Sequence, residues 1–350
     1  MPNSEISQTS QSPDAPAPES HTAPPAPSSF WSAIRESLRG SHQDYTVGPI
    51  GRSIILLAMP MVLEMCMESI FAVVYIVLGP CFIFGLGPFP KLGVAGAAVA
   101  TNIGRGTGAI YAFSRLVRKG GRFEIKRHHF RLEPAIMARL VHLSATGTFQ
   151  VFVGMASWIG LVRTISSLGT DVLAGYVIGI RVIIFALLPS WGMSNAAATM
   201  VGQALGAKKP ERAERAVWKA GFYNFIFLGT VGLIFVVFAR QIIGLFTHDP
   251  HVAPYGVDCL RIVASGFLFY AYGMVLTQSF NGAGDTWTPT IINLFVFWLW
   301  ELPLAYVLAI VFGLGPRGVF LAITIAFSSL AIVSALFAIQ QPQIHTDSHR

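Results

Sequence analysis

Long apolar runs recur along this chain, and they constrain its fold more than any other feature. Between Ser53 and Gln340 these runs reach about 20 residues, the length that a helix needs to cross the hydrocarbon core of a bilayer. Charged residues make up only 12% of the sequence, whereas soluble proteins carry about 25%. The sequence therefore predicts an all-α fold, a polytopic bundle of membrane helices.

Eight hydrophobic segments are expected to span the membrane. Each combines sufficient apolar length with few internal charges. Their approximate bounds are residues 53–78, 93–114, 140–166, 172–200, 216–246, 253–280, 288–312 and 317–339. We therefore expect about eight transmembrane helices joined by short loops.

Lysine and arginine gather in two of the loops between these segments. The loop after the second segment holds eight of them and the loop after the fourth holds five, whereas the loops after the first, third, fifth and seventh contain only Lys91 and Arg317. Because basic loops remain in the cytoplasm, both termini are expected there, in a multi-pass protein of the bacterial inner membrane. Topology then accounts for the net charge of +7, and no nucleic-acid partner is expected.

The first 49 residues differ in composition from the rest. Residues 1–28 are rich in Ser, Pro, Ala, Thr and Gln and should be disordered, because they can bury very little apolar surface. A short amphipathic helix on the membrane surface is expected next. Its apolar face would carry Phe30, Trp31, Ile34 and Leu38, with Arg35 and Arg39 nearby.

An internal repeat divides the hydrophobic part of the chain. The string Phe-Gly-Leu-Gly-Pro occurs at 84–88 and again at 312–316, followed by Gly-Val at Gly93 and at Gly318. Internal repeats are typical of secondary transporters, whose substrate sites lie between the two halves. Five predicted spans precede the second string and only one precedes the first. The first half is therefore short by roughly 140 residues, or about four membrane helices.

Four stretches of the chain resemble the multidrug and toxic compound extrusion (MATE) family. They are LLAMPMVLEMCMESIFAVV at 56–74, FIFGLGPFPKLGVAGAAVAT at 82–101, VGQALGAKKPERAERA at 201–216 and QSFNGAGDTWTPT at 278–290. In order, these strings resemble the family's first helix, the passage from its fifth helix to its sixth, the end of its eighth helix, and the turn between its tenth and eleventh helices. The resemblance covers about residues 50–340. Around Val74-Tyr75 the sequence passes directly from the first helix to the end of the fifth.

The resemblance implies a two-lobe architecture with an incomplete first lobe. Family members have twelve helices and export organic, often cationic, compounds in exchange for protons or sodium. Applied to this chain, it implies multidrug efflux by secondary antiport, with small organic cations as substrates, membrane lipids as surroundings and no cofactor beyond the coupling ion. The expected parts are a tail (1–49), a truncated first lobe (50–118), a basic cytoplasmic loop (119–139), a complete second lobe of six helices (140–340) and a cytoplasmic tail (341–350).

Glu301 is the leading candidate for the ion-coupling or substrate-binding residue. It lies mid-segment, just before Pro303, and a charged side chain deep in a bilayer costs at least about 2.5–3.5 kcal/mol. The alternative is a structural ion pair with an arginine such as Arg181. As a cation deep in an apolar segment, Arg181 is itself a further candidate for the ion-coupling or substrate-binding site. Glu64 and Glu68 share one helical face, which suits cation capture, or else they pack toward the missing helices.

Uncharged polar residues on the apolar segments complete the candidate site. They line a cavity or form hydrogen bonds between helices. These residues are Gln150, Asn195, Gln278 and Asn281.

Two alternatives to multidrug efflux remain open at this point. The chain could be a transport-inactive remnant left by an internal deletion, or a flippase for lipids or polysaccharide precursors on a related fold. An enzyme is not expected, because the sequence has no P-loop, no His-Glu-x-x-His and no Gly-x-Ser-x-Gly motif. The cysteines show no spacing typical of a metal site, and the oligomeric state stays open.

Overall fold

The computed structural model describes residues 49–86, 88–117 and 134–340, some side chains within the helices excepted. Every regular element in these ranges is a helix, so the prediction of an all-α bundle is confirmed. The elements are α2 (Ile50–Phe84), α3 (Val94–Val117), α4 (Pro134–Ser166), α5 (Thr170–Gly206), α6 (Pro210–Gly244), α7 (Ala253–Ser265), α8 (Phe267–Gly282), α9 (Trp287–Asn293), the π-helix η2 (Leu294–Glu301), α10 (Leu302–Tyr306), the π-helix η3 (Val307–Val311) and α11 (Pro316–Gln340).

All eight predicted spans fall on these helices. Within the described residues, five helical stretches are long and apolar enough to cross a membrane, and the bent pair α7 and α8 makes a sixth. The two remaining predicted spans lie in α2 and α3. Helix α4 begins at Pro134, inside the segment expected to be loop, because proline is well suited to the first turn of a helix.

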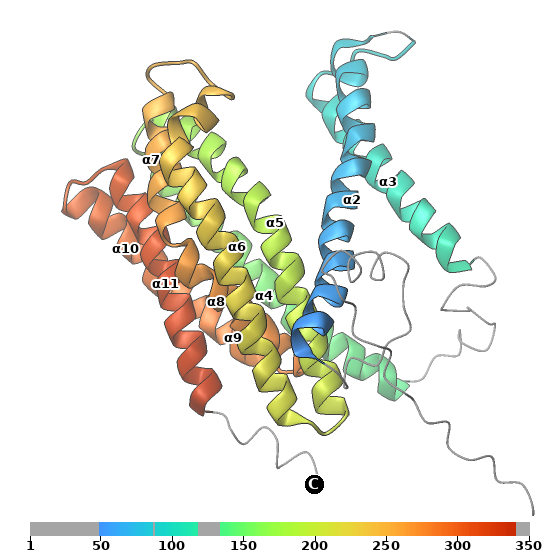
Figure 1. Cartoon of the computed structure of the whole chain (residues 1–350). Coiled ribbons are helices and arrows are strands. Elements are labelled where there is room, and N and C mark those ends of the chain that lie inside the picture. Colours follow the sequence, from blue (N-terminus) through green and yellow to red (C-terminus); the bar gives the residue numbers. More distant parts are fainter. Residues whose placement is uncertain (1–48, 87, 118–133, 341–350) are drawn as a thin grey trace, which may run out of the picture.

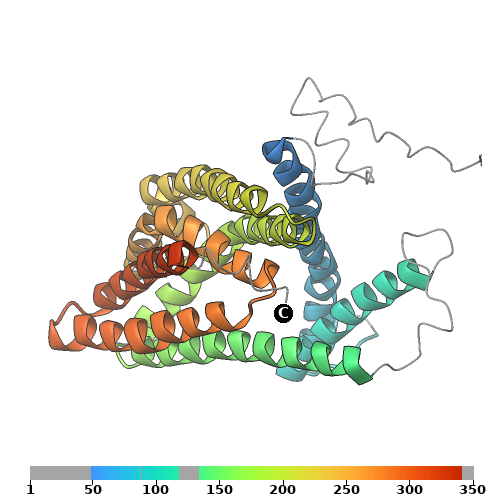
Figure 2. The same cartoon turned by 90° about the horizontal axis from the view of Figure 1, so that it is seen from below.

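The helices form two groups (Figure 1). Helices α4 to α11 make one bundle, and α2 and α3 stand beside it. Seen from below, α4 and the α9–α10 stretch line one side of the bundle and α6 lies on the opposite side (Figure 2). A core of buried aliphatic and aromatic side chains runs through the bundle and includes Leu161, Tyr176, Phe267 and Phe320.

Helix α2 joins the two groups. It is one continuous helix of 35 residues, and the junction at Val74-Tyr75 lies inside it. Its first turns pack on the bundle, where Ile50 and Ile54 contact small and aliphatic residues of α5, α6 and α8. Helix α3 packs on α2. The pair therefore attaches to the bundle of α4 to α11 through the start of α2.

The predicted span 253–280 is bent rather than straight. Helices α7 and α8 meet at Gly266 at an angle of 59°. The Thr324 hydroxyl of α11 donates a hydrogen bond to the Ile262 carbonyl, at 2.8 Å. The Gly266 amide bonds instead to the Val263 carbonyl, at 3.1 Å. A side chain that enters the helical ladder in this way is a known cause of a kink.

The two copies of the repeat form similar turns. Gly85 and Gly313, the second residues of the two strings, have left-handed φ values of 74° and 69°. Gly93 and Gly315 share a φ of 57°. In the first turn the Gly96 amide donates a hydrogen bond to the Gly93 carbonyl, and in the second the Gly318 amide donates to the Gly315 carbonyl. Both bonds measure 3.0 Å. The repeat is thus present in the structure as well as in the sequence.

The structure corrects which residues of the repeat correspond. The sequence pairs Gly93 with Gly318, but Gly96 is the residue that takes the position of Gly318. A Cβ atom at Gly96 would lie 2.6 Å from the Phe82 carbonyl carbon, and one at Gly318 would lie 2.6 Å from that of Leu308. The shared feature is this close backbone crossing, and loops of unequal length hide it in the sequence.

Small residues also set the spacing between α5 and α8. A Cβ atom at Gly282 would lie 2.6 Å from the Ala198 Cα atom, and one at Gly202 would lie 3.0 Å from the Gly282 carbonyl oxygen. Helices in membranes associate through such close backbone packing, because the hydrophobic effect does not distinguish a neighbouring helix from lipid.

We predict that Gly282→Ala destabilises the bundle by about 1–3 kcal/mol, the usual cost of overpacking, because Ala198 backbone atoms cannot move aside as a side chain would. Gly244→Ala is the matched control. Both glycines end a helix, but a Cβ atom at Gly244 meets nothing within 4 Å. Thermal unfolding in detergent measures the effect, and equal melting temperatures for the two variants would contradict the packing argument.

Candidate functional site

Glu301 occupies an irregular stretch of the bundle formed by α4 to α11. It is the last residue of η2, and only 6% of it is exposed. It lies well inside the apolar stretch Trp287–Val311. Pro303 follows in α10, and a proline has no N–H for the helical ladder. Interrupted helices at membrane depth commonly form binding sites, so this stretch is a natural place for one.

The Glu301 side chain lines a pocket of about 170 Å³. Four elements build this pocket, namely α4, α5, η2 and α11. Its walls are mostly apolar and aromatic, formed by Gly154, Ser157, Trp158, Leu161, Tyr176, Ile180, Phe297, Ile323 and Phe327. The carboxyl group is therefore held in a chamber that offers few polar neighbours.

Tyr176 brings a second polar group to this pocket. Its side chain is 1% exposed, and its ring stacks on Phe320 with centroids 6.3 Å apart. The Tyr176 hydroxyl is buried with no hydrogen-bond partner among the described residues. Trp158 is its neighbour, but the two side chains do not have the distance and angle of a hydrogen bond. Buried polar groups are almost always partnered. This hydroxyl is thus available to a ligand or a water molecule.

No cation neutralises Glu301 within the described part of the chain. The two ion pairs found there are Arg215–Glu211 and Arg317–Asp258. The alternative of a structural pair between Glu301 and Arg181 is wrong, because Arg181 lies exposed on α5 and the pocket wall contains no basic residue. An unpaired buried charge is strongly unfavourable. The carboxyl must therefore carry a proton or have a cation beside it.

The size of the pocket limits what it can hold. Pockets for drug-sized ligands measure about 300–1,000 Å³, and this one is smaller. A water molecule takes about 30 Å³ of liquid volume, so the pocket has room for a small cation with a few waters. No group of three or more His, Cys, Asp and Glu side chains gathers within the described residues.

Two hydrogen bonds attach α4 to the π-helix that carries Glu301. The Ser157 hydroxyl donates to the Phe297 carbonyl at 2.9 Å, and the Trp298 indole N–H donates to the Val153 carbonyl at 2.9 Å. Both carbonyls belong to backbone segments that face the neighbouring helix. These contacts fix the distance between α4 and η2, and with it the shape of the pocket.

Three of the predicted polar residues form one hydrogen-bonded chain away from this pocket. The Gln278 amide donates to Asn195 Oδ1 at 2.9 Å, and the Asn281 amide donates to Gln278 Oε1 at 2.6 Å. They lie in a shallow surface hollow between α5 and α8, together with Gly202 and Gly282. In the described structure these residues thus connect α8 to α5 by a hydrogen bond and also line the hollow.

The remaining predicted residues do not join the Glu301 pocket. Gln150 is half-buried on α4 and does not line it. Glu64 and Glu68 belong to α2, but their side chains lie outside the described residues.

The sequence analysis did not identify Tyr176 as a site residue, nor the hydrogen bond from Ser157 to the Phe297 carbonyl. It also missed Asn224, which accepts a hydrogen bond from Ser190 at 2.7 Å and donates to the Ala271 carbonyl at 2.9 Å. The only sequence signal for Tyr176 is its place between Gly175 and Gly179, which pack closely on α7. Gly175 and Gly179 indicate a buried helix face, and a tyrosine on such a face is a candidate for an internal hydroxyl.

Comparison with known proteins adds the family. The MatE family model matches residues 147–307, which include Glu301 and most of the pocket. The fold is similar to a crystal structure of MATE in the bent conformation, with a TM-score of 0.66 and 23% identity over 83% of this chain and 61% of that one. Over residues 147–307 the chain is similar to the MATE family. An outward-facing multidrug resistance MATE family transporter of the MOP superfamily gives a TM-score of 0.69 at 23% identity, covering 82% of this chain and 61% of that one.

The curated relatives of this chain are considerably longer. The probable multidrug resistance protein NorM of Thermotoga maritima is 28% identical over 243 residues, which are 69% of this chain and 52% of that protein. The probable multidrug resistance protein YoeA of Bacillus subtilis is 23% identical over 259 residues, 73% of this chain and 56% of that protein. The chain thus spans about half the length of the curated relatives that it matches.

We predict that Tyr176→Phe leaves the melting temperature unchanged, or raises it, in sodium-free buffer, because the hydroxyl has no protein partner to lose. Ser190→Ala serves as the comparison. It removes a hydroxyl that is also buried but bonds to Asn224 at 2.7 Å, so its melting temperature should fall. A loss of stability in Tyr176→Phe as large as in Ser190→Ala would show that the Tyr176 hydroxyl has an internal partner.

Proposed function

We propose that the second lobe of this chain is the ion-coupled lobe of a multidrug antiporter, and that Glu301 carries the coupling proton or sodium ion. The observation behind this proposal is a buried carboxyl group with no cationic partner in the described residues, facing a pocket of about 170 Å³. Such a group changes its charge state only by exchanging a small cation with the water outside.

Physical chemistry supports an exchange role over a structural one. A structural carboxylate in hydrocarbon is expected to have a fixed partner, whereas a carrier must release its cation on each cycle. The Tyr176 hydroxyl and the Glu301 carboxylate give oxygen ligands of the kind that hard cations prefer. The aromatic walls exclude bulk water, which strengthens every electrostatic interaction inside the pocket.

The transported compound would occupy a different place. The pocket is too small for a drug-sized molecule, and in secondary transporters the substrate site lies between the two halves. Two relatives are named as probable multidrug resistance proteins. We propose small organic cations as the substrates of this chain. We also propose that the basic loops and both termini face the cytoplasm.

Glu301→Gln should abolish efflux in a version of the chain that has the four missing helices restored. The amide keeps the size of the side chain but cannot hold an exchangeable cation, so coupling is lost while the protein stays in the membrane. Asp258→Asn is the control, because Asp258 forms a surface ion pair with Arg317 at 2.7 Å. Ethidium efflux from cells measures the effect. Unchanged efflux in Glu301→Gln would reduce this residue to a structural role.

The unmodified 350-residue chain should not export drugs by itself. Its first lobe offers α2 and α3 beside the bundle, and two helices cannot form half of a sealed cavity. Polar faces meant for the absent helices would meet lipid, where each unsatisfied group costs several kcal/mol. Dye efflux from cells that express this chain should equal that of empty cells. Efflux equal to that of the restored version would contradict the prediction and indicate that two chains complete one cavity.

A further inference from the structure

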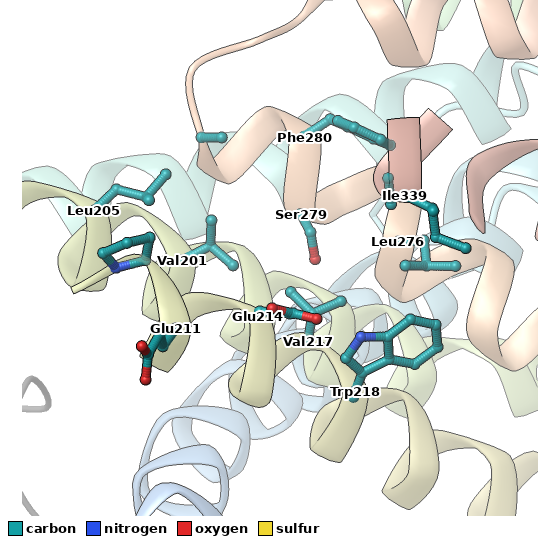
Figure 3. A pocket seen from close by; sticks show the side chains of 13 residues that line it. Val201, Leu205, Glu211, Glu214, Val217, Trp218, Leu276, Ser279, Phe280 and Ile339 are labelled. Atoms are coloured by element: carbon teal, nitrogen blue, oxygen red, sulfur yellow. The ribbon is translucent and has the colours of Figure 1, made fainter. Parts of the chain in front are cut away.

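A second and larger pocket lies at the end of the second lobe where α6 begins. It has a volume of about 450 Å³ and is formed by α5, α6, α8 and the last turn of α11. Figure 3 shows Glu214 and Trp218 from α6 and Ser279 from α8 around the same space. The rest of the wall is apolar, with Val201, Leu205, Val217, Leu276, Phe280 and Ile339.

Charged groups of both signs surround the opening of this pocket. A shallower hollow continues from it and is lined by Glu211, Glu214, Arg215, Trp218 and Lys219. Glu211 and Arg215 form an ion pair with each other at 3.3 Å. Neither Glu214 nor Lys219 forms an ion pair or hydrogen bond with another described residue. One free carboxylate and one free ammonium group thus flank Trp218.

The pocket lies where a membrane interface is expected. Helix α6 is a membrane-spanning candidate, and the pocket is at its first two turns, beside the basic loop. Tryptophan is enriched at the level of lipid headgroups, and Trp218 is 43% exposed. Ile339, on the opposite wall, is 67% exposed. The apolar part of the pocket is therefore open to a lipid chain on one side and to headgroups on the other.

We propose that this pocket binds one phospholipid with a primary amine in its headgroup, such as phosphatidylethanolamine. The ammonium group donates hydrogen bonds to the Glu214 carboxylate, and the Lys219 ammonium group pairs with the phosphate. An acyl chain lies against Val217, Leu276 and Ile339. Trp218 packs between the headgroup and the chain.

The arrangement of charges selects among the common phospholipids. Phosphatidylcholine has a quaternary ammonium group, which carries a charge but no N–H to donate to Glu214. Phosphatidylglycerol has no cation at all, so Glu214 would repel its headgroup. A charge-assisted hydrogen bond contributes about 1.5–3 kcal/mol, which corresponds to a preference of roughly tenfold or more. This proposal does not depend on ion coupling at Glu301.

Native mass spectrometry of the purified full chain tests the proposal. The protein is released from nanodiscs that contain equal amounts of phosphatidylethanolamine, phosphatidylcholine and phosphatidylglycerol, and the retained lipids are counted. The unmodified chain should retain one phosphatidylethanolamine in about tenfold excess over the other two. Glu214→Gln should abolish this excess. Asp171→Asn, which removes one carboxylate in the first turn of α5, should keep it.

A second variant separates the two headgroup contacts. Lys219→Gln should lower the retention of all three lipids by a similar factor, because each of them carries the phosphate. Equal retention of the three lipids by the unmodified chain would overturn the proposal, and so would an unchanged excess in Glu214→Gln. Displacement of all lipid by tetraphenylphosphonium, with the same dependence on Glu214, would instead assign the pocket to an organic cation.

Discussion

The structure depends on one constraint, namely that a polar group inside hydrocarbon has no water to bond to. Most internal polar groups in the bundle satisfy it with a neighbouring helix. Asn224 is fully buried and connects α5 to α8 through Ser190 and the Ala271 carbonyl. The hydrogen bond from Ser157 to Phe297 follows the same rule. The Glu301 carboxyl and the Tyr176 hydroxyl differ from these groups, because they line one pocket and the Tyr176 hydroxyl has no hydrogen-bond partner among the described residues.

Features that follow from composition and length could be predicted from the sequence. All eight predicted segments fall on helices, and six of them are supported as spans in the described residues when α7 and α8 count as one, since bilayer thickness fixes their length. Glu301 was found because it is a carboxylate deep in an apolar segment. Features that depend on contacts between distant residues could not be predicted. The bend at Gly266 requires the Thr324 hydroxyl of another helix, and the free state of Tyr176 is visible only once its neighbours are in place.

The repeat shows where prediction reached its limit. The shared five-residue string revealed two similar turns, but the residues after it were paired incorrectly. Their equivalence rests on a close backbone crossing at Gly96 and Gly318, and the two loops that precede these glycines differ in length. The matching sequence thus identified the turn, whereas only the structure identified which glycine has the same role in each copy.

The length of α2 has a consequence for the membrane itself. A helix of 35 residues is about 52 Å long, whereas the hydrocarbon core is only about 30 Å thick. Helices in membranes tilt by about 20° on average and rarely beyond 40°, so tilting alone cannot bring all of α2 into the bilayer. Its start is held against the second lobe by Ile50 and Ile54. The excess length must therefore project at the far end or locally thicken the surrounding bilayer. Bilayer thickness thus influences the angle at which α2 carries α3.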